Sequence, residues 1–286
     1  MEFKYTEDQI ALRRAVREWA QSYLAPKAEE IDVNNRFPTE TIKALGEQDL
    51  MGLAYPEELG GAGYDAISEA IAMEEISAAC ASTGSIITGH YLGFDALYLA
   101  GTPEQKEKYL RMLTEGHKVG AFALTEPDAG SDAAKGTCVA ELQGDHYVLN
   151  GSKIFITNGY VADVFVVFAM TDKSKGTRGI SAFIVESSFP GFSVGKHEEK
   201  LGLHGSPTAE IVFTDCIVPK ENLLGAEGKG FKIAMQTLDG GRIGIAAQAL
   251  GIAEGAMEES INFAKTREQF GRPIAKFQNT QFLFAD

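Results

Sequence analysis

The chain has 286 residues, of which 44% are hydrophobic and 23% are charged, and its formal net charge is −14 at pH 7. This composition is typical of a globular protein, and the length allows two or three packed units. The acidity argues against nonspecific nucleic-acid binding, because phosphates are repelled and no run of Lys and Arg provides a basic patch. An anionic small molecule remains compatible with it, since a few local cations and backbone N–H groups can bind one.

Cysteine and histidine patterns give no sign of a metal or a disulfide framework. Cys80, Cys138 and Cys216 lie far apart without CxxC spacing and are predicted to be buried, reduced thiols. The five histidines form no HExxH and no Cys/His cluster, so no metal is predicted. The N-terminus lacks the apolar core of a signal peptide, and the most apolar stretch, 161–170, is too short to span a bilayer. A cytoplasmic protein without a membrane or nucleic-acid partner is expected.

Residues 1–118 are predicted to form a helical domain. Thr6 and Gln9 have the spacing of a capping box, and apolar residues at helical spacing follow them. A similar helix start begins at Thr102. The glycine-rich ELGGAGYD between these starts lacks GxGxxG spacing and a preceding strand, so a turn is expected rather than a dinucleotide site.

Residues 119–224 are predicted to form a β domain. Its apolar runs are bounded by Gly, Pro, Asp and Ser and have no helical pattern between them; they are HYVLNGSKIFIT, DVFVVFAM, GISAFIVE and AEIVFTDCIV. Asn150-Gly151 lies within the first run and predicts a hairpin turn. Strands without intervening helices favour an antiparallel sandwich or barrel over a Rossmann unit.

Residues 225–286 are predicted to begin a second helical domain. The segment after Gly228 is long, alanine-rich and periodic. GAEGKGFK, at its start, has no Ser or Thr after the lysine, which argues against a Walker loop. A last helix is expected from about Asn279, but the sequence stops at Asp286. A helix so short is hard to nucleate, so an incomplete chain is expected.

Four motifs stand out, and each has a plain structural interpretation. FALTEPDAGSD, at 122–132, begins as a strand and turns polar; Pro127 and Gly130 would suit a surface turn, although a loop shaped around a ligand is the alternative. KIFITNG would be a strand end. The two glycines of LDGGR would mark a helix kink or close helix packing. In TREQFGRPIAKFQ, Arg267 would be an exposed cation at a helix C-terminus, where the helix dipole favours it.

These motifs, in this order and within an α, β, α arrangement, resemble the acyl-CoA dehydrogenase family over the whole chain, most closely its short-chain, butyryl-type members. The resemblance implies an α+β multidomain fold with a helical N-terminal domain, a middle antiparallel β domain and a C-terminal helical bundle, usually assembled as a tetramer. It implies FAD as cofactor, an acyl-CoA as substrate and an electron-transfer flavoprotein as electron acceptor. The family's bundle continues beyond the end of this sequence, so the chain is expected to be truncated.

The first motif of the family binds FAD. By the resemblance, Leu124 and Thr125 would offer backbone and hydroxyl groups to the flavin ring, and Gly130 would allow close approach. Ser131 would contact both the cofactor and the thioester of the substrate. Lys135 departs from the small residue that the family prefers, but it lies past the contact positions.

The second motif would provide a wall and a hydroxyl. Phe155 occupies a position that is Trp in many members and would pack on the flavin face. Thr157 would place its hydroxyl near flavin N5, where it can donate to one redox state and accept from the other. The remaining residues assigned to this part of the FAD site are Phe122 and Ile156.

The last motif would act across a subunit boundary. In the family, the residues matching Arg267, Phe270, Phe277 and Gln278 contact the FAD of a neighbouring subunit, and a guanidinium is suited to grip a pyrophosphate. FAD binding and oligomerisation would then be linked.

The third motif would bind the substrate. Asp239 and Arg242 match family residues that contact acyl-CoA, together with Ser131. Some members carry their catalytic Glu directly before this Arg, but here that position is Gly241. The family's usual base is a Glu in the later part of the bundle, and neither Glu126 nor Glu254 matches a catalytic position. No catalytic residue is therefore assigned.

The resemblance implies FAD-dependent oxidation of a short-chain acyl-CoA to its trans-2-enoyl-CoA, with the chain as given expected to be inactive or nearly so. Two other hypotheses stay open. One is a flavin oxidase or monooxygenase of the same fold, and the other is a noncatalytic fragment that only binds flavin or CoA esters.

Overall fold

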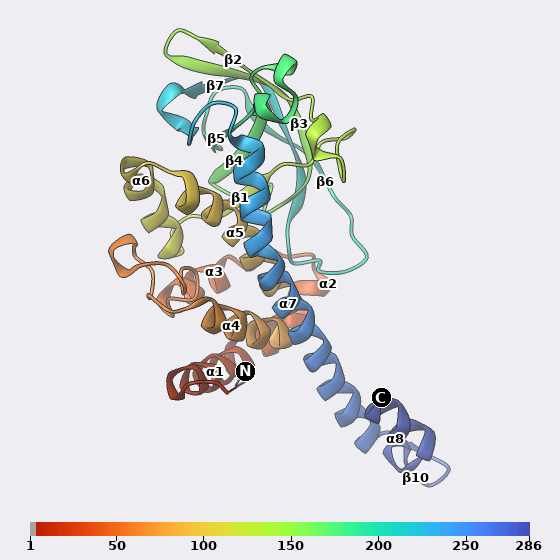
Figure 1. The fold of residues 1–286 in the computed structure, drawn as a ribbon. Coiled ribbons are helices and arrows are strands. Elements are labelled where there is room, and N and C mark those ends of the chain that lie inside the picture. Colours follow the sequence, from red (N-terminus) through yellow and green to blue (C-terminus); the bar gives the residue numbers. More distant parts are fainter. Residues whose placement is uncertain (1–3) are drawn as a thin grey trace.

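The computed structural model describes residues 4–286 and has a helical part, a β domain beside it and one long helix that runs along both (Figure 1). The N-terminal part is helical, as predicted. Its helices are α1 (Glu7–Trp19), α2 (Ala25–Val33), α3 (Thr39–Glu47), α4 (Ala66–Ala79), α5 (Ala81–Ala100) and α6 (Pro103–Thr114), with a π-helical turn, Ala20–Leu24, between the first two.

Capping boxes start α1 and α6, as predicted from the sequence. The Gln9 N–H donates to Thr6 Oγ1 at 3.2 Å, and the Thr6 N–H donates to Gln9 Oε1 at 3.0 Å. Thr102 and Gln105 repeat this exchange at the start of α6. Each exchange satisfies backbone N–H groups that have no partner inside the helix, which fixes where the helix begins.

The β domain is confirmed, with one correction: its sheet is mixed and does not close into a barrel. The strands are β1 (Gly120–Ala123), β2 (Val139–Gln143), β3 (His146–Thr157), β4 (Val164–Met170), β5 (Ile180–Glu186), β6 (Phe192–His197), β7 (Thr208–Pro219) and β8 (Leu223–Leu224). They pair in the order β6-β7-β3-β2-β4-β5-β8, and β1 pairs with β4 in parallel. Parallel pairing joins segments far apart in the chain, so no local turn signal reveals it.

The predicted hairpin turn at Asn150-Gly151 is wrong. Gln143 pairs with His146, so Gly144-Asp145 makes the turn, and β3 runs on through the Asn-Gly pair. The pairing of β3 with β7 shifts its register between Leu149 and Gly151, which marks a bulge. Gly151 has φ +140°, and a Cβ there would lie 2.8 Å from the Cα of Cys138. Glycine is needed at this position for a bulge and a close backbone contact rather than for a turn.

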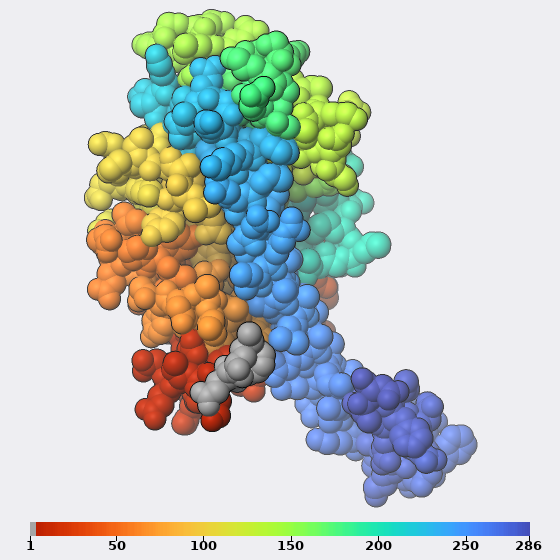
Figure 2. Space-filling view, viewed as in Figure 1, coloured from red at the N-terminus to blue at the C-terminus, as the bar shows by residue number. Residues whose placement is uncertain are grey.

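A single long helix, α7 (Gly230–Thr266), crosses α4 and α5 and then extends away from the body of the molecule (Figures 1 and 2). A Cβ at Gly251 would lie 2.1 Å from the carbonyl oxygen of Glu74, and one at Gly255 would lie 2.4 Å from that of Ala78. Glycine at these positions therefore lets α7 pack directly on the backbone of α4. The extended end carries β9 (Glu268–Gln269), β10 (Arg272–Pro273) and α8 (Gln278–Ala285).

The glycines of LDGGR lie within this continuous helix, and one of them, Gly241, allows close packing. A Cβ at Gly241 would lie 2.5 Å from Cδ2 of Leu92 on α5, whereas Gly240 has nothing within 4 Å of its missing Cβ. The two neighbouring glycines therefore have different environments, one against α5 and one beside open space.

The three cysteines, Cys80, Cys138 and Cys216, are buried free thiols, as predicted. No helix within residues 4–286 has the length and hydropathy needed to traverse a bilayer. Over the same residues, no group of three or more His, Cys, Asp or Glu side chains is placed to hold a metal ion.

Candidate functional site

A cavity of about 450 Å³ lies where the β domain meets α5 and α7. Most of the residues predicted to bind cofactor or substrate line it, namely Phe122, Leu124, Thr125, Gly130, Ser131, Phe155, Ile156, Thr157 and Arg242. The other lining residues carry no sequence motif that assigned them to a site; they are Gly89, Leu92, Ala133, Met235 and Leu238. Three motifs that are far apart in the sequence therefore form one site, between a sheet and two helices.

The first wall of the cavity is the loop that leaves β1. Phe122, near the end of this strand, packs on Phe168 of β4 with 4.9 Å between ring centroids. The loop backbone is then fixed to β3, because the Ile154 N–H donates to the Thr125 carbonyl oxygen at 2.9 Å. This bond holds Thr125 at the cavity wall. The predicted surface turn is also present, because the Ala129 N–H donates to the Glu126 carbonyl oxygen at 3.1 Å and Pro127 and Asp128 are exposed. The loop therefore contains a surface turn and also forms one wall of the cavity.

A buried ion pair holds the same loop from behind. Lys153 Nζ lies 2.6 Å from Glu126 Oε1, both side chains are 2% exposed, and Nζ also donates to the Leu124 carbonyl oxygen at 3.1 Å. Glu126 accepts further hydrogen bonds from Thr137 and from the Cys138 N–H. Burial by itself would raise the pKa of Glu126, but attraction to Lys153 and these hydrogen bonds outweigh burial and lower the pKa.

This pair explains why Glu126 is not a candidate base. Its carboxylate is held ionised beneath the loop and does not line the cavity. The signal that the sequence offered was a lysine inside an apolar strand, at Lys153. A buried lysine requires a carboxylate partner, and Glu126, in the loop that leaves β1, provides it.

The second wall is the end of β3, where a bulge exposes an aromatic ring. The register between β3 and β7 shifts between Lys153 and Ile156. Phe155 lies in this bulge with φ +57°, and its side chain is 60% exposed although it is large and apolar. A bulky residue at positive φ is a strained conformation, which persists only where the surrounding structure imposes it. The bulge turns a flat apolar surface toward the cavity.

Thr157 is positioned by a notch in α5. A Cβ at Gly89 would lie 2.6 Å from Cγ2 of Thr157, so only glycine leaves room for this side chain. The next residue, Asn158, is buried and donates to the carbonyl oxygens of Ile86 on α5 at 3.0 Å and Gly120 on β1 at 3.2 Å. The end of β3 is therefore joined to both the helix and the strand that border the cavity.

The polar groups of the cavity wall suit a flat, hydrogen-bonding cofactor such as a flavin. Within the described chain no protein group hydrogen-bonds to the side-chain hydroxyls of Thr125, Ser131 or Thr157. Gly130 has nothing within 4 Å of its missing Cβ, so a ligand can reach the backbone there. Free hydroxyls, an apolar ring surface and exposed backbone together match the mixed apolar and polar edges of an isoalloxazine ring.

Four predicted cofactor residues lie elsewhere. Arg267, Phe270, Phe277 and Gln278 are at the far end of α7 and in the segment after it, away from the cavity (Figure 1). Phe270 is 94% exposed, and its ring lies 6.1 Å from that of Phe277. The structure therefore separates these residues from the chain's own cavity, which is the arrangement expected if they serve another subunit.

The substrate residues are only partly brought together. Arg242 lines the cavity, and its Nε lies 3.5 Å from Asp239 Oδ1 one turn away on α7, with both side chains exposed. Asp239 itself is not in the lining. Arg242 is therefore the substrate residue of this pair that lines the cavity, and Asp239 lies beside its guanidinium outside the lining.

Comparison with known families matches three models that together cover most of the chain. They are "Acyl-CoA dehydrogenase, N-terminal domain" at residues 6–117, "Acyl-CoA dehydrogenase, middle domain" at 121–216 and "Acyl-CoA dehydrogenase, C-terminal domain" at 228–286. The domain boundaries drawn from the sequence, 1–118, 119–224 and 225–286, stay predictions.

The chain is similar to proteins of known identity along its whole length. A short-chain specific acyl-CoA dehydrogenase of Clostridium acetobutylicum is 56% identical, with 100% of this chain and 76% of that protein covered. The structure of butyryl-CoA dehydrogenase from Megasphaera elsdenii matches with a TM-score of 0.96 and 47% identity, again covering 100% and 76%. A chain in the structure of the electron transferring flavoprotein of Acidaminococcus fermentans matches with a TM-score of 0.98 and 55% sequence identity, covering 100% of this chain and 76% of that one.

The predicted cofactor is confirmed at the level of the family. A glutaryl-CoA dehydrogenase from Mycobacterium smegmatis, solved in complex with FADH2, matches this chain with a TM-score of 0.92 and 33% identity, covering 98% of this chain and 71% of that one. The structural relatives are FAD-dependent flavoproteins, and the cavity described above has the groups that such a cofactor needs.

Proposed function

Because the chain belongs to the acyl-CoA dehydrogenase family, a family of oxidoreductases, we propose that its cavity binds FAD and a short-chain acyl-CoA for oxidation to the trans-2-enoyl-CoA. The observation that carries this proposal is the convergence of Thr125, Phe155 and Thr157 on one cavity from two separate motifs. The butyryl-type substrate is supported by the short-chain and butyryl-CoA relatives.

The protein's part in this chemistry is orientation and electrostatics. When bound, FAD supplies the acceptor for the hydride that leaves the β carbon of the acyl group. Phe155 gives the ring an apolar surface, and the hydroxyls of Thr125 and Thr157 hydrogen-bond its polar edge. A hydroxyl both donates and accepts, so Thr157 can serve the cofactor in either redox state. The two motifs would together hold the cofactor in this cavity.

Ser131 and Arg242 would hold the CoA ester on the open side of this ring. Removal of the α proton needs hydrogen bonds that stabilise the developing enolate oxygen, and it needs a base. No carboxylate lines the cavity within the described residues. Glu254 is also engaged elsewhere, since its Oε1 lies 2.6 Å from Arg17 Nη2. We therefore propose that residues 1–286 bind the ester but turn it over slowly or not at all, which keeps the noncatalytic binding hypothesis in view.

Arg267, Phe270, Phe277 and Gln278 would complete the FAD site of a neighbouring copy. Their position far from the chain's own cavity and the exposure of Phe270 support this role. The structure of an electron transferring flavoprotein that contains a closely similar chain supports such a protein as the electron acceptor. The tetramer and the cytoplasmic location stay predictions.

A spectroscopic titration tests the proposed function. The chain is mixed with FAD, unbound FAD is removed, and butyryl-CoA is added without oxygen while the flavin absorbance is recorded. The proposal predicts retained flavin whose spectrum shifts with butyryl-CoA but bleaches slowly. A protein that stays colourless at saturating FAD, or a flavin spectrum that is insensitive to the ester, would refute it. Anaerobic bleaching that reverses at once when oxygen is admitted, with release of hydrogen peroxide, would instead indicate an oxidase.

A further inference from the structure

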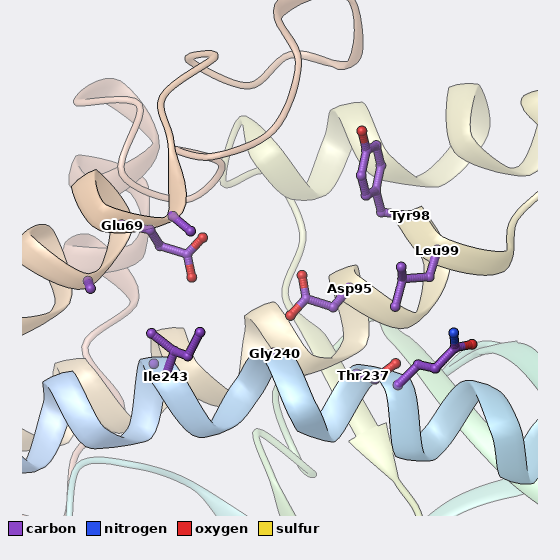
Figure 3. A pocket seen from close by; sticks show the side chains of 11 residues that line it. Glu69, Asp95, Tyr98, Leu99, Thr237, Gly240 and Ile243 are labelled. Atoms are coloured by element: carbon purple, nitrogen blue, oxygen red, sulfur yellow. The ribbon is translucent and has the colours of Figure 1, made fainter. Parts of the chain in front are cut away.

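A second cavity, of about 260 Å³, lies between α4, α5 and α7 (Figure 3). It shares no lining residue with the flavin cavity. The α7 residues that line it are Gln236, Thr237, Gly240, Ile243 and Gly244, whereas those of the flavin cavity are Met235, Leu238 and Arg242. At 100° per residue these two sets occupy different faces of one helix, so α7 separates the two cavities.

Two carboxylates point into this second cavity without a cation to pair with. Glu69 comes from α4 and Asp95 from α5, and Figure 3 shows both above α7. Within residues 4–286 neither carboxylate forms an ion pair. Burial and repulsion from Asp95 raise the pKa of Glu69 to about 7. Burial raises the pKa of Asp95 to about 6. Both residues are half-buried, and carboxylates that are partly removed from water without a cation favour either protonation or a bound cation.

Within residues 4–286, the groups that interact with these carboxylates carry no positive charge. Asp95 accepts a hydrogen bond from the Tyr55 hydroxyl. Burial, and in addition the negative charge of Asp95, raises the pKa of the Tyr55 and Tyr91 phenols. The cation on a neighbouring element is Lys106 of α6, whose Nζ lies 4.9 Å from the ring centre of Tyr98. This lysine contacts the aromatic ring and forms no ion pair with either carboxylate.

A third oxygen points to a ligand independently of the acidic pair. Thr237 is 1% exposed, and its Oγ1 has no hydrogen-bond partner in the described structure although the residue lines the cavity. A buried hydroxyl left unpaired is unfavourable, so a missing partner is the expected reason for it. In Figure 3 the Thr237 oxygen lies on the side of α7 that faces Asp95.

Apart from Tyr98 and the exposed Gln236, the rest of the lining is apolar or open. Ala66, Ala70, Leu99 and Ile243 provide carbon surface. Gly240 and Gly244 have nothing within 4 Å of their missing Cβ atoms, so the floor of the cavity is empty space rather than packed side chains. A cavity of roughly 150 Å³ already holds a benzene molecule, so this one accommodates a small organic group.

We propose that this cavity binds a primary alkylammonium ion. An –NH₃⁺ group has three N–H donors, and Glu69, Asp95 and Thr237, whose side-chain oxygens can accept them, all line this cavity. Its hydrocarbon part would lie against Leu99, Ile243 and the open floor at the two glycines. Two carboxylates alone are too few ligands for a metal ion, and apolar walls would not solvate one, which favours the organic cation.

Cyclohexylammonium chloride is a suitable probe, with cyclohexanol as its neutral analogue of equal size. Isothermal titration calorimetry on the 286-residue chain should show saturable 1:1 binding of the amine at pH 8 and binding of cyclohexanol that is at least about tenfold weaker, since charge-assisted hydrogen bonds are the stronger kind. Because the acceptors must be ionised, affinity should fall as the pH is lowered from 8 to 5. Equal binding of both compounds, affinity independent of pH, or no saturable binding would overturn the proposal.

Variants locate the site. Glu69→Gln and Asp95→Asn should each weaken amine binding about tenfold or more, and Thr237→Val should weaken it less, because a neutral acceptor is lost. Gly240→Leu should abolish binding by filling the floor, and its side chain has room there. FAD retention should be unchanged in all four, because the two cavities share no residue. If folded variants of both carboxylates, or the folded Gly240→Leu chain, bind the amine as the unchanged protein does, the site assignment is wrong.

Discussion

Gly89→Ala should disturb the flavin cavity from α5, the helix that borders it. The residue lies within α5, and its missing Cβ would be 2.6 Å from Cγ2 and 3.0 Å from Cβ of Thr157. Real Cβ atoms do not approach so closely, so either Thr157 or the helix must shift. Thr157 is the residue whose hydroxyl we assign to the flavin, and a shift therefore reaches the cofactor.

The magnitude follows from two opposing effects. Alanine in place of glycine stabilises a helix interior by about 1 kcal/mol. Overpacking in a tight interior costs about 1–3 kcal/mol. The net change should be a loss of stability of up to about 2 kcal/mol. Displacing one hydrogen-bonding hydroxyl should in addition weaken FAD binding by about 0.5–1.5 kcal/mol, which is up to about tenfold in Kd.

Urea unfolding and an FAD fluorescence titration measure these two quantities. Gly240→Ala is the matched control, because its Cβ meets nothing within 4 Å; it should gain about 1 kcal/mol and bind FAD unchanged. Thr157→Ser keeps the hydroxyl and removes Cγ2, so it should partly relieve the alanine in a double variant. If Gly89→Ala behaves like Gly240→Ala in both assays, the notch in α5 does not position Thr157.

Three further predictions concern charge and catalysis. Lys153→Met leaves Glu126 buried without its cation, so urea unfolding should show a free energy of unfolding lower by about 3–5 kcal/mol. The double variant Lys153→Met/Glu126→Gln should recover much of this loss. Equal losses in the single and double variants would argue against a stabilising ion pair. Burial lowers the pKa of His90 to about 3. As the pH falls below about 6.5, the unfolded chain therefore takes up a proton that the folded chain does not, and the free energy of unfolding should fall toward pH 3 by at most about 1.4 kcal/mol per pH unit. A His90→Asn chain with the same slope over this range would contradict the assignment to His90. Gly241→Glu places a carboxylate next to Arg242 and requires only the end of Leu92 to move, so flavin bleaching by butyryl-CoA should become faster than in Gly241→Gln; equal rates would show that the carboxylate does not reach the substrate.

Local signals in the sequence were sufficient for the elements that local chemistry determines. The capping boxes at Thr6 and Thr102 start helices because they satisfy backbone groups within a few residues. The apolar runs form strands as predicted, because alternating apolar residues and β-branched side chains favour strands through short-range effects. Recognition of the flavin loop, by contrast, depended on the family resemblance, because its composition alone favours a surface turn.

Features that depend on distant parts of the chain were missed. The turn predicted at Asn150-Gly151 is absent, because glycine is required there by close contact with Cys138, the residue before β2. The parallel pairing of β1 with β4 likewise joins segments that no short pattern connects. Gly89 carries no signal within its own helix, since only the position of Thr157 explains it. Long-range contacts of this kind determine the geometry of the site, whereas local patterns determine the elements that carry it.

A crystal structure of the chain grown with FAD tests the central claim most directly. The account predicts the isoalloxazine ring in the cavity beside Phe155, with the hydroxyls of Thr125 and Thr157 both within about 3 Å of its polar edge. A ring bound outside this cavity, or one that contacts neither hydroxyl, would contradict it.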